Sequence, residues 1–370
     1  MKDILEKLVS IPTVTGESVP IGVAINYIED YLLERGMKVE RLVSDGHASL
    51  VATASGTKTP KVMLAAHVDV SPGSDEQFFL RETAGRLYGR GVVDMKFAIA
   101  SYLQIVDDLR NQLNKYDFGI MITSDEEEGG LNGTAHLVNK GYLPKVCVLP
   151  DGGDNWQIQT FAKGFFYLEI TVHGKAAHGS RPWLGDNAIV TLTHVITDIA
   201  ALFPDMSADT NTYNIGLVRG GDSVNQVADH AHISLEIRVI SETEKTRLLE
   251  QITALCRAHK AEFEVVLDGT TCHFTLDNKY VAPFVQAVQE VTGVTIKGSR
   301  SLGASDARYF AARHIPCVSL YPTGGNHHGP DEWIDKKAFY DFKVVIQRYL
   351  DAVARIPEAT KSTAELEHVA

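Results

Sequence analysis

The chain has 370 residues, more than one hydrophobic core usually holds, so its length predicts two domains. Hydrophobic residues make up 44% and charged residues 22% of it, which is the composition of a soluble globular protein. The formal net charge of −12 argues against nucleic acid or an anionic membrane surface as a main partner.

The first residues, MKDILEKLVSIPTVTGES, contain no long apolar segment of the kind that secretory signals have, and no later run is long enough to span a membrane. The cysteines are scattered without CxxC spacing, as expected for buried thiols in a reducing compartment. We therefore expect a cytoplasmic protein. The cysteines are Cys147, Cys256, Cys272 and Cys317.

The first 150 residues alternate between helical and strand patterns, which predicts an α/β domain with a mixed sheet. The stretch 62–70, VMLAAHVDV, is typical of a strand buried on both faces, and it ends at His67 and Asp69. Residues two apart on a strand point to the same side, so His67 could face a metal ion while Asp69 orients its ring. The first expected helices and strands lie at 3–9, 19–35, 37–43, 50–54 and 62–66.

Three further acidic positions follow loops or strands of this domain. Asp94 lies in GRGVVDMK, where it could cap the next helix or bridge two cations. The buried strand 118–123 is followed by SDEEE, which is either a solvated turn or a set of carboxylates that needs a cation. The strand near 146–150 ends in Asp151. Because ligands in open α/β sheets bind at the carboxyl ends of the strands, these positions suggest a shared cation site.

The pattern changes after residue 164. Residues 165–173 alternate as a half-exposed antiparallel strand does, and a strand-helix-strand-strand-helix-strand order follows. This order predicts a small α+β domain of ferredoxin-like type, inserted at 165–276 between the two parts of the first domain, 1–164 and 277–370. After a predicted strand at 315–321 comes GGNHHGPDE, which adds His328 to the strand-end residues.

Six motifs occur in an order that resembles a known family: HVD at 67–69, GRGVVDMK at 89–96, TSDEE at 123–127, HGSRPWLGDNA at 178–188, GASDAR at 303–308 and HGPDE at 328–332. The chain is similar over nearly its whole length to the co-catalytic zinc hydrolases. This family includes succinyl-diaminopimelate desuccinylase, acetylornithine deacetylase, aminoacylase, glutamate carboxypeptidase and several dipeptidases. The resemblance implies a zinc-exopeptidase catalytic domain with an inserted lid and dimerisation domain.

The resemblance also implies a ligand set for two zinc ions, for which cobalt or manganese could substitute. His67 resembles a ligand of one ion and His328 a ligand of the other, and Asp94 resembles the bridging carboxylate, followed in this family by a cis peptide bond. Glu127 and Asp151 resemble the terminal ligands. The register of the acidic run rests on counting forward from Ser124, and the choice of His328 over His327 rests on the His-x-x-Asp-Glu spacing.

Further roles follow from the same resemblance. Glu126 resembles the general base, and we predict it as a catalytic residue together with Asp69, which the strand pattern already places beside His67, and His178. His178 resembles a residue that reaches an active site, often that of the partner subunit, and could donate a hydrogen bond to an oxyanion. Asn225 and Arg238 fall where the family contacts its substrate. From the residues alone, His178 could be a solvated surface group and Arg238 a surface ion pair.

The predicted function is hydrolysis of the amide bond in a small N-acyl amino acid or a short peptide, by a homodimer. Position 151 is Asp. Deacylases and carboxypeptidases of the family usually have Glu at this ligand position, whereas aminopeptidases and dipeptidases usually have Asp. Asp154 is a second candidate for the same ligand. Deacylation and di- or aminopeptidase action therefore both remain open. An inactive binding relative is the alternative of another class, although every expected ligand and base position is filled.

Overall fold

The computed structural model describes residues 1–357, and the chain divides into two compact units. Unit 1 consists of residues 1–158, 275–298 and those from 315 on, and unit 2 consists of residues 159–274 and 299–314. The inserted domain was expected as one continuous stretch, 165–276. Unit 2 also contains 159–164 and the separate piece 299–314, for which the sequence pattern gave no signal.

The central sheet of unit 1 is mixed, as expected, with the strand order β1-β2-β6-β3-β7-β17. β1, β2 and β6 pair antiparallel, whereas β6, β3, β7 and β17 run parallel. Every residue of β3 and β6 is buried, which explains their uninterrupted apolar sequences. The strands are β1 (Lys38–Ser44), β2 (His47–Thr53), β3 (Val62–His67), β6 (Phe118–Thr123), β7 (Val146–Val148) and β17 (Cys317–Val318).

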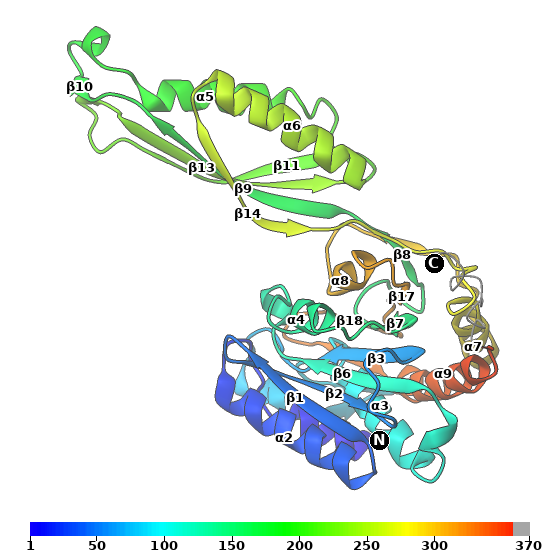
Figure 1. The fold of residues 1–370 in the computed structure, drawn as a ribbon. Coiled ribbons are helices and arrows are strands. Elements are labelled where there is room, and N and C mark those ends of the chain that lie inside the picture. Colours follow the sequence, from blue (N-terminus) through cyan, green and yellow to red (C-terminus); the bar gives the residue numbers. More distant parts are fainter. Residues whose placement is uncertain (358–370) are drawn as a thin grey trace, which may run out of the picture. The chain divides into compact units, whose positions relative to one another are not determined.

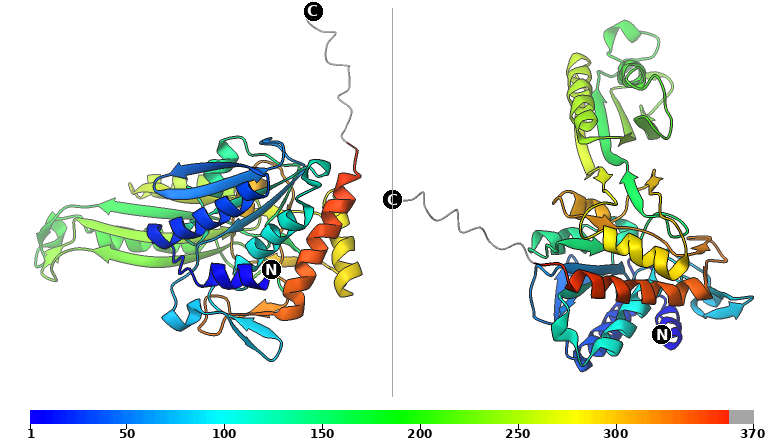
Figure 2. Two further views of the ribbon diagram at one scale, coloured as in Figure 1. Left: turned by 90° about the horizontal axis from the view of Figure 1, so that it is seen from below. Right: turned by 90° about the vertical axis from the view of Figure 1, so that its right-hand side faces the viewer.

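Helices of unit 1 pack on this sheet and on one another. α2 packs against β1 and β2, and α3 contacts α1, β3 and α9. α7 and α9 lie side by side in both views of Figure 2 although more than forty residues separate their starts. The helices are α1 (Lys2–Val9), α2 (Ser18–Glu34), α3 (Lys96–Leu109), α4 (Thr134–Asn139), α7 (Ala282–Thr292) and α9 (Lys336–Ala354).

A small antiparallel sheet of unit 1 joins two segments far apart in the chain. Its order is β18-β19-β5-β4, so the strand after His328 pairs with the strand before Asp94. This pairing explains why two loops that are distant in sequence meet. The strands are β4 (Arg81–Thr83), β5 (Arg86–Tyr88), β18 (Gly324–Gly325) and β19 (Trp333–Asp335).

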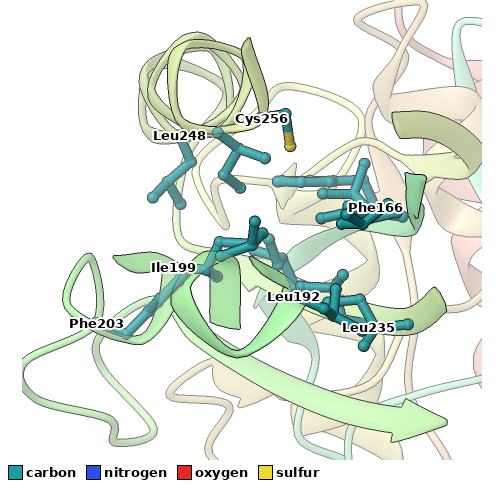
Figure 3. Packing of buried hydrophobic residues seen from close by; sticks show 14 of the residues in the cluster. Phe166, Leu192, Ile199, Phe203, Leu235, Leu248 and Cys256 are labelled. Atoms are coloured by element: carbon teal, nitrogen blue, oxygen red, sulfur yellow. The ribbon is translucent and has the colours of Figure 1, made fainter. Parts of the chain in front are cut away.

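Unit 2 has the predicted strand-helix-strand-strand-helix-strand order and an antiparallel sheet, β11-β13-β9-β14. Figure 1 shows α5 and α6 on one face of this sheet, and Figure 3 shows apolar side chains of both helices meeting those of the strands. Asn187 and Ser241 cap the two helices by accepting backbone hydrogen bonds. The elements are β9 (Gly164–His173), α5 (Ala188–Ala200), β11 (Thr212–Gly220), β13 (His230–Val239), α6 (Glu242–Ala258) and β14 (Glu262–Gly269).

Shorter elements complete unit 2. β16 (Ser299–Ser301) pairs parallel with β8 (Gln159–Ala162), which also pairs with β15 (Cys272–His273), so the piece 299–314 is tied to unit 2 by a strand. α8 (Ala307–Ala311) belongs to the same piece, and β10 (Ala177–His178) pairs with β12 (Gln226–Val227).

The strand expected at 315–321 is wrong in length, because only Cys317 and Val318 pair with β7. The cysteines are all buried, as expected. Within residues 1–357 we find no helix with the length and apolar character needed to cross a bilayer.

Candidate metal centre

The carboxyl ends of three neighbouring parallel strands carry the candidate ligands. β3 lies between β6 and β7 in the sheet, and His67 at its end is in register with Thr123 at the end of β6. The chain therefore delivers His67 from β3, the acidic run from β6 and Asp151 from β7 to one edge of the sheet. This register confirms the strand-end prediction for His67 and the acidic run.

Asp69 organises the neighbouring loops. It is fully buried, and its carboxylate accepts hydrogen bonds from the backbone N–H of Glu126 at 3.4 Å and of Glu127 at 3.2 Å. Thr15 donates a third hydrogen bond at 3.2 Å. The ring nitrogen Nδ1 of His67 lies 2.9 Å from the backbone oxygen of Asp69, which leaves Nε2 directed at Asp94. Asp69 thus fixes both the imidazole and the acidic run.

Asp94 lies between the two histidines. Its Oδ1 is 3.2 Å from Nε2 of His67, and its Oδ2 is 3.2 Å from Nε2 of His328. The same His328 nitrogen lies 3.2 Å from Oε2 of Glu127. The alternative that Asp94 caps α3 is wrong, because Met95 is the N-cap residue, and the Asp94–Met95 peptide is cis as the resemblance implied.

Glu332 and Arg90 hold the Asp94 loop against the His328 loop. The buried carboxylate of Glu332 accepts backbone hydrogen bonds from Gly91, Val93 and Asp94 at 2.9–3.2 Å. Arg90 donates to Glu332 at 3.1 Å and to the backbone oxygen of His328 at 3.0 Å. Gly91 has φ +77°, and a Cβ there would lie 2.7 Å from Val70, so only glycine fits this turn. These contacts join two candidate ligands that are far apart in sequence.

The donor atoms form two groups. The first contains His67, Glu126 and Asp151, and the second contains Asp94, Glu127 and His328; within each group the ligand atoms lie within 4.8 Å of one another. Among residues 1–357, Oδ2 of Asp151 is buried and has no hydrogen-bond partner. A buried carboxylate oxygen without a donor is costly unless a cation binds it, and imidazole and carboxylate suit zinc. The residues present therefore fit a pair of divalent cations.

The electrostatics of the cluster point the same way. Hydrogen bonds to Asp94 and Glu127 raise the pKa of His328 to about 10. Burial lowers the pKa of His67, but hydrogen bonds to Asp69 and Asp94 outweigh burial and hold that pKa well above its usual value. Burial and the nearby Asp94 raise the pKa of Asp151. The carboxylates thus favour positive charge on both imidazoles, and cations bound by the same groups would replace those protons.

Unit 2 holds the other predicted site residues at two separate places. His178 in β10 and Asn225 are neighbours, because the N–H of Gly179 donates to the backbone oxygen of Asn225 at 2.7 Å. Both side chains are exposed. These two residues lie near the start of β13. Arg238 lies near the end of β13, where it pairs with Glu236 and stacks on Phe165 at 5.0 Å. At a rise of about 3.3 Å per residue, the length of β13 separates Arg238 from the other two by roughly 30 Å.

The sequence did not predict the roles of Tyr321 and Arg90. It also did not predict the hydrogen bonds that Glu332 accepts. The Tyr321 hydroxyl lies 2.6 Å from Asp151 and 3.1 Å from Asp94. Arg308 of unit 2 also lies over the Phe165 ring, at 5.5 Å. An arginine between two glycines was the one available signal for Arg90; nothing local marks Tyr321.

Asp154, the second candidate for the ligand of β7, is exposed and belongs to neither donor group.

Comparisons with known proteins show the family of the chain and relatives of its fold. The model of peptidase family M20/M25/M40 matches residues 63–353. A succinyl-diaminopimelate desuccinylase from Sulfurovum sp. (strain NBC37-1) is 26% identical over 89% of this chain and 92% of its own. Among solved structures, a tripeptidase from Staphylococcus aureus has a TM-score of 0.77 at 20% identity, covering 96% of this chain and 98% of its own. An M20 family metallo-carboxypeptidase from Sulfolobus solfataricus has a TM-score of 0.74 at 17% identity, covering 95% and 98%. At these identities the two structures bear on the fold alone.

Proposed function

The chain belongs to peptidase family M20/M25/M40, and from this membership and the geometry of the cluster we propose that it is a di-zinc hydrolase of amide bonds. Its substrate is a small N-acyl amino acid or a short peptide. The observation that carries the proposal is the pair of adjacent donor groups, one of which contains Asp94 and the other the unpartnered oxygen of Asp151. His67 and Asp151 would hold one ion, Glu127 and His328 the other, and Asp94 both.

Zinc ions bound there would supply Lewis acidity, which would polarise a substrate carbonyl and lower the pKa of a bound water from about 15.7 to about 7. Glu126 accepts a proton from the attacking water and delivers it to the leaving nitrogen. Its backbone N–H donates a hydrogen bond to Asp69 at 3.4 Å, which keeps the start of the acidic run next to the end of β3. His178 donates a hydrogen bond to the oxyanion, and Asn225 and Arg238 bind the substrate.

Support for Arg238 as the residue that binds a substrate carboxylate comes from its surroundings. It stacks on Phe165, as Arg308 does, and within the described residues its Nη1 is buried without a hydrogen-bond partner. Because about 30 Å of β13 separate it from His178, one unit 2 cannot offer both side chains to one small substrate. This separation supports a homodimer in which His178 serves the partner's substrate.

The substrate class divides the proposal into two candidates. The family relative reported above is a desuccinylase, which favours deacylation. Asp at 151 favours a di- or aminopeptidase. A panel of N-succinyl and N-acetyl amino acids against di- and tripeptides, with released amine measured, separates them. Zinc binding with no hydrolysis of any member would favour an inactive binding relative.

The decisive experiment is the Glu126→Gln variant. We expect kcat to fall by about 100- to 10,000-fold, because the proton acceptor is lost, while zinc content by elemental analysis stays at two ions per chain. Since Glu126 also lies within reach of His67 and Asp151, the same measurement tests a ligand role. A variant that loses zinc would make Glu126 a ligand, and one with normal kcat would remove the base. Hydrolysis that survives complete chelation would end the metal mechanism.

A further inference from the structure

Tyr321 places a phenol among the candidate metal ligands, and the fold fixes its position. The side chain is buried, and the backbone oxygen accepts a hydrogen bond from Trp156 at 2.8 Å. The ring centroid lies 4.5 Å from that of His327. With backbone and ring both held, the place of the hydroxyl is set by packing rather than by rotation of a loose side chain.

The hydroxyl meets two carboxylates, and the contacts are unequal. It lies 2.6 Å from Oδ1 of Asp151 and 3.1 Å from Oδ1 of Asp94. A phenol has one hydrogen to donate, and the shorter distance assigns it to Asp151. The other oxygen of Asp151, Oδ2, is buried without a hydrogen-bond partner among residues 1–357. The two oxygens of this carboxylate therefore differ: Oδ1 accepts a hydrogen bond from Tyr321, and Oδ2 accepts none among the described residues.

We propose that Tyr321 is a positioning residue of the metal centre: its hydroxyl holds Oδ1 of Asp151, so that Oδ2 alone is presented to a divalent cation bound with His67. The proposal rests on the proposed function, because it takes the cluster as a metal site. A list of metal ligands does not say what orients each of them. The proposal names the group that orients the Asp151 carboxylate. Aspartate has a short side chain, so a fixed rotation about its last bond defines where its free oxygen points.

The consequence is a graded metal affinity that depends on one hydroxyl. Groups that hydrogen-bond to metal ligands typically change metal affinity by about 10- to 100-fold when they are removed. Tyr321→Phe keeps the ring against His327 and removes the donor. We expect zinc to bind about 10- to 100-fold more weakly at one of the two sites of the full-length chain, with the other site unchanged. The assay is competition between the metal-free protein and a chromophoric chelator for Zn²⁺.

Tyr349→Phe is the matched control. Tyr349 is also a buried tyrosine of unit 1, but its hydroxyl donates to the backbone oxygen of Tyr280 at 3.0 Å. We expect its zinc affinity to equal that of the original chain. Thermal unfolding of both metal-free variants checks that they fold alike. If both variants lose affinity equally, or if neither loses any, Tyr321 does not position Asp151.

A double-mutant cycle separates positioning from general packing. If the hydroxyl acts through Asp151, adding Tyr321→Phe to Asp151→Asn changes zinc affinity little beyond Asp151→Asn alone. Equal effects of Tyr321→Phe in both backgrounds would overturn the proposal. Direct coordination would also overturn it, and would appear as an ionised-phenol signal in the ultraviolet difference spectrum on adding Zn²⁺, absent in Tyr321→Phe. A wild-type chain that binds no zinc would instead refute the proposed function.

Discussion

The cluster of unit 1 and the His178–Asn225 pair of unit 2 are built in opposite ways. In unit 1, buried carboxylates and backbone N–H groups from distant segments fix the ligands, as Asp69 and Glu332 do. In unit 2, the exposed side chains contact residues two positions away: Oγ of Ser180 lies 2.8 Å from Nδ1 of His178, and Ser223 donates to Asn225 at 2.6 Å. Metal binding should therefore be a property of unit 1, whereas the contribution of unit 2 should depend on bound substrate.

The largest expected effect falls on Asp94, which belongs to one donor group and also lies 3.2 Å from His67 of the other. Asp94→Ala removes the carboxylate between His67 and His328, so we expect zinc content to fall below one ion per chain and hydrolysis to become undetectable. Asp154→Ala is the matched control, because this exposed aspartate belongs to neither group, and it should keep both ions. Elemental analysis after gel filtration gives the answer. Retention of two ions by Asp94→Ala would contradict the assignment of the bridge.

The next effect tests the other half of the comparison. His178→Ala should lower kcat/KM by about 100- to 1,000-fold, the usual cost of one oxyanion donor, and leave zinc content and thermal unfolding unchanged. His230→Ala removes another exposed histidine of unit 2 and should have no effect on kcat/KM.

Mixing two inactive variants sharpens this test. Random dimers of His178→Ala and Glu126→Gln chains should recover about one quarter of the original activity, because half are heterodimers with one complete site. Recovery would establish that His178 acts on the partner's substrate. A mixture as inactive as its components, from chains shown to exchange, would place His178 and Glu126 of one chain at the same site.

The smallest effect concerns the contacts that align the two loops. Glu332→Gln weakens the pairing with Arg90, which is itself buried, so the free energy of unfolding of the metal-free chain should fall by about 3 kcal/mol. The neighbouring Asp331 is mostly exposed, and Asp331→Asn should change this free energy little. Denaturant titration compares the two. Equal stability of both variants would show that the Arg90–Glu332 pair does not hold the loops.

The sequence predicted the ligand strands well because their signals are local. An apolar run that stops at His67 or at Ser124 requires only a buried strand and a polar end, and parallel pairing then brings the ends together. The αβ order of unit 2 was predicted from alternation and helical periodicity for the same reason. Asp94 was ambiguous because a loop residue before a helix has two local explanations, and only its contacts with both histidines decide between them.

What the sequence could not predict depends on contacts over long separations. Tyr321 is 170 positions from Asp151, and Glu332 is 239 positions from Val93. A short sequence segment of the kind used to predict a helix or strand therefore contains neither pair. The parallel pairing of β16 with β8 is equally nonlocal, and it assigns 299–314 to unit 2. The strand after Ile315 was predicted too long because its later residues are buried without pairing in the sheet.

The order of the donor groups along the chain has a consequence for biosynthesis. During translation, His67, Glu126 and Asp151 have all been synthesised once the chain reaches residue 151. The second donor group is complete only when His328 has been added. The whole of unit 2 is synthesised in between. A ribosome-bound or prematurely terminated product that stops before residue 328 can thus carry every donor of one group while lacking the imidazole of the other, so the second donor group is complete only in nearly full-length chains.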